Sequence, residues 1–183
     1  MKDNLISLSS ILILFLSACG SSQNKDLLQL VTVKQVDLKQ YIGKWFEIAK
    51  IPNSFQDQCA YGTTAEYKID EDEDIIVINS CYEKDGNPDV AEGLAKVVDR
   101  KTNAKLEVSF VNFLGIRPFW GDYWIIGLDE NYQWAVVGTP SRKYGWILSR
   151  TPSLPDNTMQ EIFSLLKSQN YNPADFEMSR QKE

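Results

Sequence analysis

The chain has 183 residues, a length that suits one domain, and its hydrophobic content of 43% is enough for a buried core. Its formal net charge of -6 argues against nucleic acid or an anionic membrane surface as an electrostatic partner. Histidine is absent, which removes the commonest general base and the commonest zinc ligand. Serine hydrolases with the usual triad, papain-like proteases and most zinc enzymes are therefore poor candidates.

Residues 1–18 have the composition of a targeting sequence. Lys2 precedes an apolar run over residues 5–16 that is interrupted by serines and is too short to span a bilayer, as is typical of a signal peptide. Small residues then lead to Cys19, and a polar stretch follows it, which resembles the lipobox of bacterial lipoproteins. The resemblance implies cleavage before Cys19 and acylation of this residue, and several acyl chains together give firm anchoring. A chance cysteine after an ordinary signal sequence is the alternative.

The residues after Cys19 indicate where the chain is sorted and where its folded part begins. Gly20, in place of an aspartate, resembles lipoproteins that are sorted to the bacterial outer membrane. Residues 19–32 are expected to form a lipidated, flexible tether with little structure of its own. Residues 33–183 are expected to form one folded domain.

A glycine and a tryptophan open the first strand-like segment, which ends at Pro52. Gly43 lets the backbone turn sharply or pass close to another segment, because it has no Cβ atom. Trp45 carries a large apolar surface and one N–H group that needs a partner. We therefore expect Trp45 to plug one end of a closed sheet.

The next two segments read as a β-hairpin. Residues 59–69 are extended and rich in Thr and Tyr, residues 75–79 are aliphatic, and the acidic run 70–74 separates them. The acidic spacing also resembles a calcium-binding loop, but Ile75 occupies the position of the required glycine and the closing glutamate is missing. A solvated turn is the favoured interpretation.

Two cysteines remain after lipidation, and they are predicted to form a disulfide. Cys59 and Cys81 are an even pair in a chain that we expect to be exported, and such pairs are more often bridged than free. The hairpin would place Cys81 opposite Thr63 rather than Cys59. The bridge therefore requires a bulge near residues 60–62, which Gly62 would permit.

The rest of the chain continues the pattern of short strands and ends with one helix. The apolar stripe of Met159, Ile162, Phe163 and Leu166 after Pro155 predicts an amphipathic helix that covers the sheet. Eight strands followed by a helix predict an all-β fold: an eight-stranded up-and-down antiparallel barrel with one C-terminal α-helix packed on its outside. Such a barrel can hold one small ligand. The remaining strands are expected at residues 90–98, 104–110, 122–127, 133–137 and 144–150, with an edge strand at 176–178.

Three motifs occur in order along this pattern: Gly43-x-Trp45, Leu128-Asp129-x-x-Tyr132 and the run 147–152, which reads Ile-Leu-Ser-Arg-Thr-Pro. In these residues the sequence resembles the lipocalin family, and specifically its bacterial outer-membrane lipoprotein branch, to which apolipoprotein D is related. The resemblance covers residues 37–178. It implies that Gly43, Trp45 and Arg150 form the closed base of the barrel, with Arg150 stacked on Trp45 in a structural role.

The family pattern also implies which side chains point into the barrel, because alternate residues of a strand face opposite sides. Their mixture of aromatic, aliphatic and a few polar groups suits an acyl chain with a small head group. As alternatives, the same residues fill the barrel as ordinary core, or a shift of register by one residue reverses a strand. The expected ligand-binding residues are Ala65, Tyr67, Val77, Asn79, Val108, Phe110, Tyr123, Ile125, Val137, Tyr144 and Trp146.

The alternation that points Trp45 inward does the same for Glu47 and Ala49. An inward carboxylate is costly unless it is hydrogen-bonded, paired or protonated. Glu47 is therefore either a structural partner near the base or a contact to a ligand head group. Its closeness to Trp45 favours the structural role.

The resemblance implies a lipid-anchored protein of the bacterial outer membrane whose domain faces the periplasm. It would bind a fatty acid, a lysophospholipid or a similar amphiphile, for lipid storage, transport or envelope maintenance. The expected partners are this small ligand, the membrane through lipidated Cys19, and a second copy in a homodimer. No nucleic acid, cofactor or metal site is expected.

Two other classes of function stay open. One is a structural or partner-binding lipoprotein with a filled barrel, in which Phe119 and Trp120 form a contact patch for a membrane or another chain. The other is a lipid-modifying enzyme. The chain has no Gly-x-Ser-x-Gly motif and no histidine, so such an enzyme would depend on carboxylates, tyrosines or a reduced cysteine. We therefore expect a binding protein rather than an enzyme.

Overall fold

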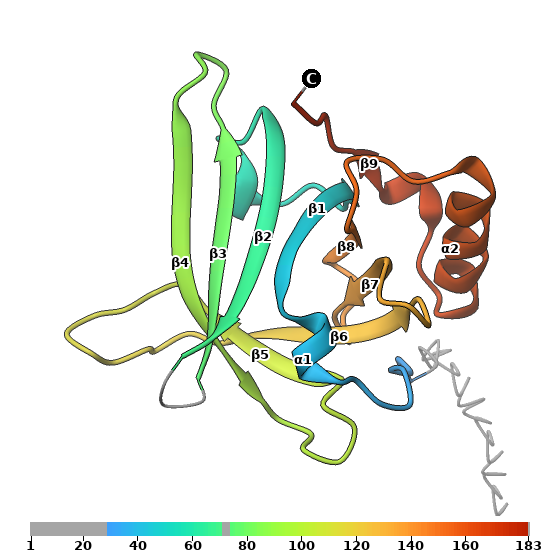
Figure 1. Cartoon of the computed structure of the whole chain (residues 1–183), viewed down its shortest axis with the longest axis horizontal. Coiled ribbons are helices and arrows are strands. Elements are labelled where there is room, and N and C mark those ends of the chain that lie inside the picture. Colours follow the sequence, from blue (N-terminus) through green and yellow to red (C-terminus); the bar gives the residue numbers. More distant parts are fainter. Residues whose placement is uncertain (1–28, 71–73, 183) are drawn as a thin grey trace, which may run out of the picture.

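The structure is a computed structural model, and it describes residues 29–70 and 74–182. Its strands form one antiparallel sheet in the order β2-β3-β4-β5-β6-β7-β8-β1-β9, and β1 also pairs with β2, which closes the sheet into a barrel (Figure 1). The predicted eight-stranded barrel and the edge strand near residue 177 are thereby confirmed. The strands are β1 (Gly43–Lys50), β2 (Tyr61–Ile69), β3 (Ile75–Tyr82), β4 (Pro88–Val97), β5 (Lys105–Ser109), β6 (Gly121–Leu128), β7 (Trp134–Gly138), β8 (Gly145–Ser149) and β9 (Glu177–Met178).

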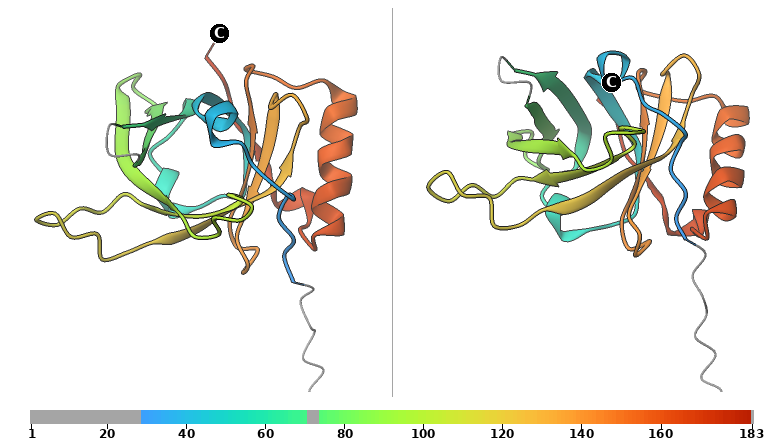
Figure 2. Two further views of the ribbon diagram at one scale, coloured as in Figure 1. Left: turned by 60° about the horizontal axis from the view of Figure 1, so that its bottom comes forward. Right: turned by 90° about the horizontal axis from the view of Figure 1, so that it is seen from below.

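Within the described residues, two α-helices and two 3-10 turns accompany the barrel. The predicted helix is α2 (Asp156–Ser168), which lies outside the ring of strands in every view (Figures 1 and 2). The one-turn helix α1 (Leu38–Tyr41) and the 3-10 turns η1 (Ser54–Gln56) and η2 (Pro173–Asp175) were not predicted. None of the described helices is long and apolar enough to cross a membrane.

The N-terminal predictions fall largely outside the described residues. This holds for the signal peptide at residues 1–18, for Cys19 and for most of the tether, as it does for residues 71–73 of the acidic turn. The predicted end of the tether at residue 32 needs correction. Leu30 is buried between the barrel wall and α2, and Val31 N–H donates to Gln169 Oε1 at 3.0 Å. The chain therefore packs on the domain before residue 33.

The core has two parts, one inside the barrel and one between its wall and α2. The inner cluster surrounds Trp45, which is fully buried. The outer cluster combines Ile126, Val136 and Ile147 of the wall with the apolar stripe of α2. This division explains why all five residues of β7 are buried, since one face points into the barrel and the other meets the helix.

A β-bulge in β1 reverses the alternation of its side chains. Glu47 pairs with Leu148, but Ala49 pairs with Ile147, so β1 contains one more residue than β8 at this point. Ala49 consequently belongs to the outer cluster, and its predicted inward direction was wrong. The same shift turns Lys50 toward the inner side, where its Nζ lies 3.3 Å from Glu47 Oε1.

The base of the barrel is closed by Arg150 and Trp45. The guanidinium carbon of Arg150 lies 3.7 Å from the centre of the Trp45 ring. Its Nη1 and Nη2 atoms also donate to the carbonyl oxygens of residues 40, 41, 42 and 44 at 2.8–3.1 Å. These carbonyls end α1 and begin β1, and the last carbonyls of a helix have no partners within it. One side chain therefore caps a helix end and covers the buried indole.

Replacing Arg150 by lysine should lower the free energy of unfolding by about 2–3 kcal/mol. An ammonium group keeps the charge, but it can neither stack on the indole nor reach several carbonyls in one plane. Urea unfolding followed by tryptophan fluorescence measures the loss.

Arg180→Lys is the matched control, because exposed Arg180 lies farther from its aromatic partner, at 5.6 Å from the centre of the Tyr61 ring. That variant should change stability by less than about 0.5 kcal/mol. Equal losses in the two variants would contradict the role given to Arg150.

Candidate functional site

The barrel contains a cavity of about 610 Å³, within the range of small-molecule sites. A barrel filled by its own side chains, one of the alternatives from the sequence, is therefore not what this chain forms. Most of the side chains expected to contact a ligand do line the cavity: Ala65, Tyr67, Val77, Asn79, Val108, Phe110, Tyr123, Tyr144 and Trp146.

Two residues of the expected set do not line the cavity. Ile125 and Val137 point inward, but both are completely buried in the inner cluster. Alternation along a strand gives the direction of a side chain and not its depth. The predicted list is therefore corrected at these two positions.

Loop residues complete the lining, and strand alternation could not have identified them. Phe55 and Gln56 come from η1, and Phe119 and Trp120 from the β5–β6 loop. The Phe55 ring lies 5.3 Å from that of Tyr144, centre to centre. The exposed aromatic character of these loops was the available signal, and at Phe119 and Trp120 it had suggested a contact patch instead.

Three tyrosines, Tyr41, Tyr67 and Tyr123, form a floor between the cavity and the Trp45 ring. Tyr67 Oη donates to Tyr123 Oη at 2.8 Å, and the Oη atoms of Tyr41 and Tyr123 also share a hydrogen bond of 2.8 Å. Burial raises the pKa of Tyr67 to about 12, and it raises the pKa of Tyr41 and Tyr123 well above the usual range. The tyrosine floor is therefore uncharged at physiological pH.

Glu47 lines the cavity, yet protein donors occupy its carboxylate. Its Oε2 accepts a hydrogen bond of 2.7 Å from Gln56 Nε2, and its Oε1 accepts from Lys50 Nζ and Ser179 Oγ. Gln56 Oε1 in turn accepts from Trp146 Nε1 at 3.1 Å. Glu47 thus ties β1, η1 and the C-terminal segment together, which supports the structural role favoured from the sequence.

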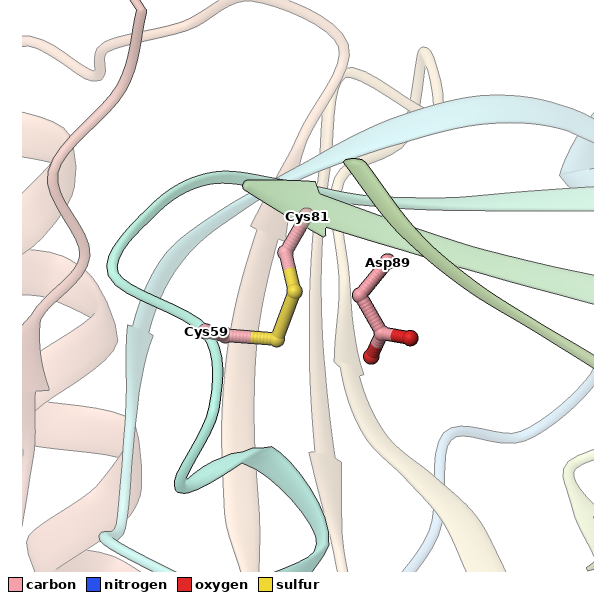
Figure 3. Close-up of side chains that lie close together, drawn as sticks. All are labelled: Cys59, Cys81 and Asp89. Carbon is pink, nitrogen blue, oxygen red and sulfur yellow. A yellow bond between two sulfur atoms is a disulfide. The ribbon is translucent and has the colours of Figure 1, made fainter. Parts of the chain in front are cut away.

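The predicted disulfide between Cys59 and Cys81 is present, with a Cα–Cα distance of 5.5 Å (Figure 3). The required bulge is also found, since β2 and β3 shift register between Tyr61 and Thr64. Gly62 lies in this bulge with a φ of +67°, a conformation that favours glycine. The bridge therefore depends on a local break in the strand pairing.

Asp89 lies beside the disulfide and offers the only further ligand atom in this group of described residues (Figure 3). The two sulfur atoms are bonded to each other, so they are not thiolate ligands. The Asp89 carboxylate already accepts a hydrogen bond of 2.7 Å from Gln58 Nε2. The cluster is therefore a structural tie near the cavity rather than a metal centre.

The charged groups of the cavity are all acidic. Glu47, Asp89 and Asp122 are among its lining residues, and no lysine or arginine is among the described residues that line it. A buried anion without a cationic partner is strongly disfavoured. The described lining residues therefore offer no cationic side chain to a bound anion.

Comparison with known proteins is consistent with this architecture. The family model described as a lipocalin-like domain matches residues 36–181. Insecticyanin from the tobacco hornworm Manduca sexta superposes with a TM-score of 0.68 at 26% identity, covering 83% of this chain and 84% of that one. The cockroach allergen Per a 4 shares the fold with a TM-score of 0.65 at 22% identity, and the match covers 84% of this chain and 94% of the allergen chain.

The sequence relatives include proteins from a plant and a bacterium. Temperature-induced lipocalin-1 of Arabidopsis thaliana is 37% identical over 147 residues, which cover 79% of this chain and 78% of that protein. The outer membrane lipoprotein Blc of Vibrio cholerae is 35% identical over 164 residues, which cover 87% of this chain and 92% of that protein. Given the family match over the whole barrel and relatives that are identical at more than a third of the aligned positions, this chain belongs to the lipocalin family.

Proposed function

We propose that this lipocalin binds a single-chain amphiphile, with the acyl chain in the barrel and a head group of zero or positive net charge at the mouth. A lysophospholipid with a zwitterionic head or an uncharged monoacylglycerol fits this description. A free fatty acid, also expected from the sequence, would place its carboxylate among Glu47, Asp89 and Asp122. The absence of a lysine or arginine among the described lining residues is the observation that carries the proposal.

Burial of the chain supplies the binding energy. Each methylene group removed from water contributes about 0.8 kcal/mol, so about ten of them would contribute roughly 8 kcal/mol before the costs of association. The tyrosine floor and the base below it close the inner end, so the chain enters from the opposite end. The head group then remains near solvent, where its hydration is retained.

Membrane anchoring is the second part of the proposal. The lipobox-like sequence at Cys19 supports it, and so do relatives named as outer membrane lipoproteins. In this proposal the domain faces the periplasm and carries or stores lipid there, in support of the envelope. Formation of a homodimer stays a prediction.

The structure removes one of the groups that an enzyme could have used. Such an enzyme could have used a reduced cysteine, but Cys59 and Cys81 are bonded to each other. The tyrosines of the floor have raised pKa values and keep their protons, so they are poor bases. Ligand binding without chemistry is the function that the site supports best.

The head-group preference can be measured by displacement of an uncharged fluorescent probe from protein purified without detergent. A lysophosphatidylcholine should displace the probe at roughly tenfold lower concentration than the fatty acid of the same chain length, a difference of about 1.4 kcal/mol. Ala65→Trp, which fills the cavity, should abolish displacement by both lipids. Lys68→Trp, at an exposed position of the same strand, should leave it unchanged. Absence of saturable displacement by either lipid would refute the proposal.

Replacing one acidic lining residue by a basic one should change the preference between the lysophospholipid and the fatty acid. Asp89→Lys replaces an acidic lining residue by a cation, so the fatty acid should bind about fivefold to tenfold more tightly, by roughly 1 kcal/mol, in this variant. Binding of the lysophosphatidylcholine should change little. The same displacement assay measures both, and Asp85→Lys, on the exposed β3–β4 turn, is the control for net charge.

A further inference from the structure

The tyrosine floor has one more hydrogen-bond donor than it uses. Each of the three hydroxyl groups carries one proton, because burial keeps all three tyrosines neutral. Only two hydrogen bonds join them, from Tyr67 to Tyr123 and between Tyr41 and Tyr123. One O–H group in a buried site is therefore left without an acceptor among the described residues, which is costly unless something else accepts it.

The position of the spare proton follows from the geometry of the cluster. Tyr67 donates to Tyr123, so its proton is already used. The Tyr41–Tyr123 bond can run in either direction. When Tyr41 donates, Tyr123 accepts two hydrogen bonds and its own proton is free. Tyr123 lines the cavity and Tyr41 does not, so an acceptor inside the cavity selects this arrangement.

We infer that the floor is a polar subsite for an uncharged oxygen carried by the inner part of the ligand, with Tyr123 as the donor. The ligand class is an acyl chain bearing a hydroxyl or keto group at or near its end. A carboxylate does not suit this position, because no lysine or arginine is among the described residues that line the cavity and the Arg150 guanidinium lies against the Trp45 ring, beneath the floor. This inference rests on the proposed function and specifies the ligand further.

The test compares monoacylglycerols of graded chain length, each with and without a terminal hydroxyl group, in the displacement assay. At the length that reaches the floor, the hydroxyl group should tighten binding about fivefold, by roughly 1 kcal/mol, because it accepts a hydrogen bond otherwise unmade. A plain chain that binds shows that the proposed function holds, whatever the hydroxyl group does. If the hydroxyl group weakens binding at every chain length, the subsite does not exist.

Substitutions in the tyrosine floor test which residue is responsible for the tighter binding of the hydroxylated chain. Tyr67→Phe/Tyr123→Phe removes both hydroxyl groups that line the cavity, so the hydroxylated chain should bind more weakly than the plain one. Tyr41→Phe is the matched control. It removes a member of the same cluster but leaves the Tyr123 proton free, so the preference should persist. Loss of the preference in Tyr41→Phe alone, with plain-chain binding intact, would overturn the role of Tyr123.

A separate observation concerns the β5–β6 loop, residues 110–120, which extends away from the barrel on the side opposite α2 (Figures 1 and 2). Its tip exposes large apolar side chains, with Leu114 at 88%, Phe113 at 69% and Ile116 at 67%. The loop contains no aspartate or glutamate. This is a concentrated apolar surface, of a kind that marks interaction sites.

Three backbone N–H groups of the tip have hydrogen-bond acceptors within the loop. Phe113 and Ile116 exchange two N–H to carbonyl hydrogen bonds of 2.9 Å, and Gly115 N–H donates to Asn112 Oδ1 at 2.9 Å. Leu114 has a φ of +51°, a conformation in which asparagine or glycine is the usual residue. A leucine that is strained and almost fully exposed has no structural benefit in water.

We propose that this tip inserts into the interface of a lipid bilayer with little net charge. The hydrogen bonds within the loop lower the cost of moving its backbone into an apolar medium, and the apolar side chains supply the energy. The base of the loop has an aromatic ring and cations, as at membrane interfaces: Lys96 Nζ lies 4.2 Å from the centre of the Trp120 ring, and Arg117 Nη1 donates to Ser109 O. Phe119 and Trp120 also line the cavity, so insertion would bring the cavity to the lipid.

Flotation with phosphatidylcholine vesicles tests this, using residues 20–183, which include the whole described barrel but not the predicted acylation site. Phe113→Ser/Leu114→Asn should reduce vesicle binding at least tenfold and leave probe displacement in solution unchanged. Val90→Ser/Val98→Ser removes comparably exposed apolar side chains, at 60% and 55%, and should leave vesicle binding unchanged. If the loop variant binds vesicles normally but loses self-association in sedimentation experiments, the patch contacts a second copy and the bilayer proposal is wrong.

Discussion

The contact between Arg150 and Trp45 is the constraint on which the rest of the structure depends. Without Arg150, the buried indole would be exposed to water at one end of the barrel, and the carbonyls of residues 40, 41, 42 and 44 would lose the donors that the guanidinium supplies. The guanidinium provides both a cover for the ring and donors for those carbonyls. Because this end is closed, the proposed ligand would enter the cavity from the other end.

The base and the cavity differ in polarity. The base holds a cation against an aromatic ring, the floor holds neutral hydroxyl groups, and Asp89 and Asp122 supply negative charge among the lining residues. The buried carboxylate of Glu47 is paired with Lys50, which faces it because of the bulge in β1. Among the acidic lining residues, Glu47 therefore has a cationic partner close by.

The features that could be predicted from the sequence are those in which apolar residues recur at a fixed spacing. The anchor at Trp45, alternation along the strands and the helical stripe of α2 were sufficient for the fold and for most of the lining. The prediction failed where this spacing is interrupted or absent. The bulge in β1 places Ala49 on the outer face of the barrel, where an inward direction had been predicted. Ile125 and Val137 point inward as predicted, but they are completely buried and do not line the cavity. Phe55 and Gln56 line the cavity from η1, which has no strand pattern in the sequence. The alternation of residues along a strand indicates which way each side chain points. How deep a side chain lies and which path a loop takes depend instead on contacts between segments that are distant in the sequence.

The places where local preference is violated are informative about function. Leu114 occupies a backbone conformation that glycine or asparagine adopts at less cost, and the tyrosine floor keeps a donor for which the described part of the chain supplies no acceptor. Neither feature stabilises the isolated domain in water, and each would be relieved by lipid, at the surface in one case and in the interior in the other. Phe119 and Trp120 belong to both the loop and the cavity wall. In the two proposals, lipid therefore contacts the loop at the surface and the tyrosine floor inside the cavity, and these two residues lie between the contacts.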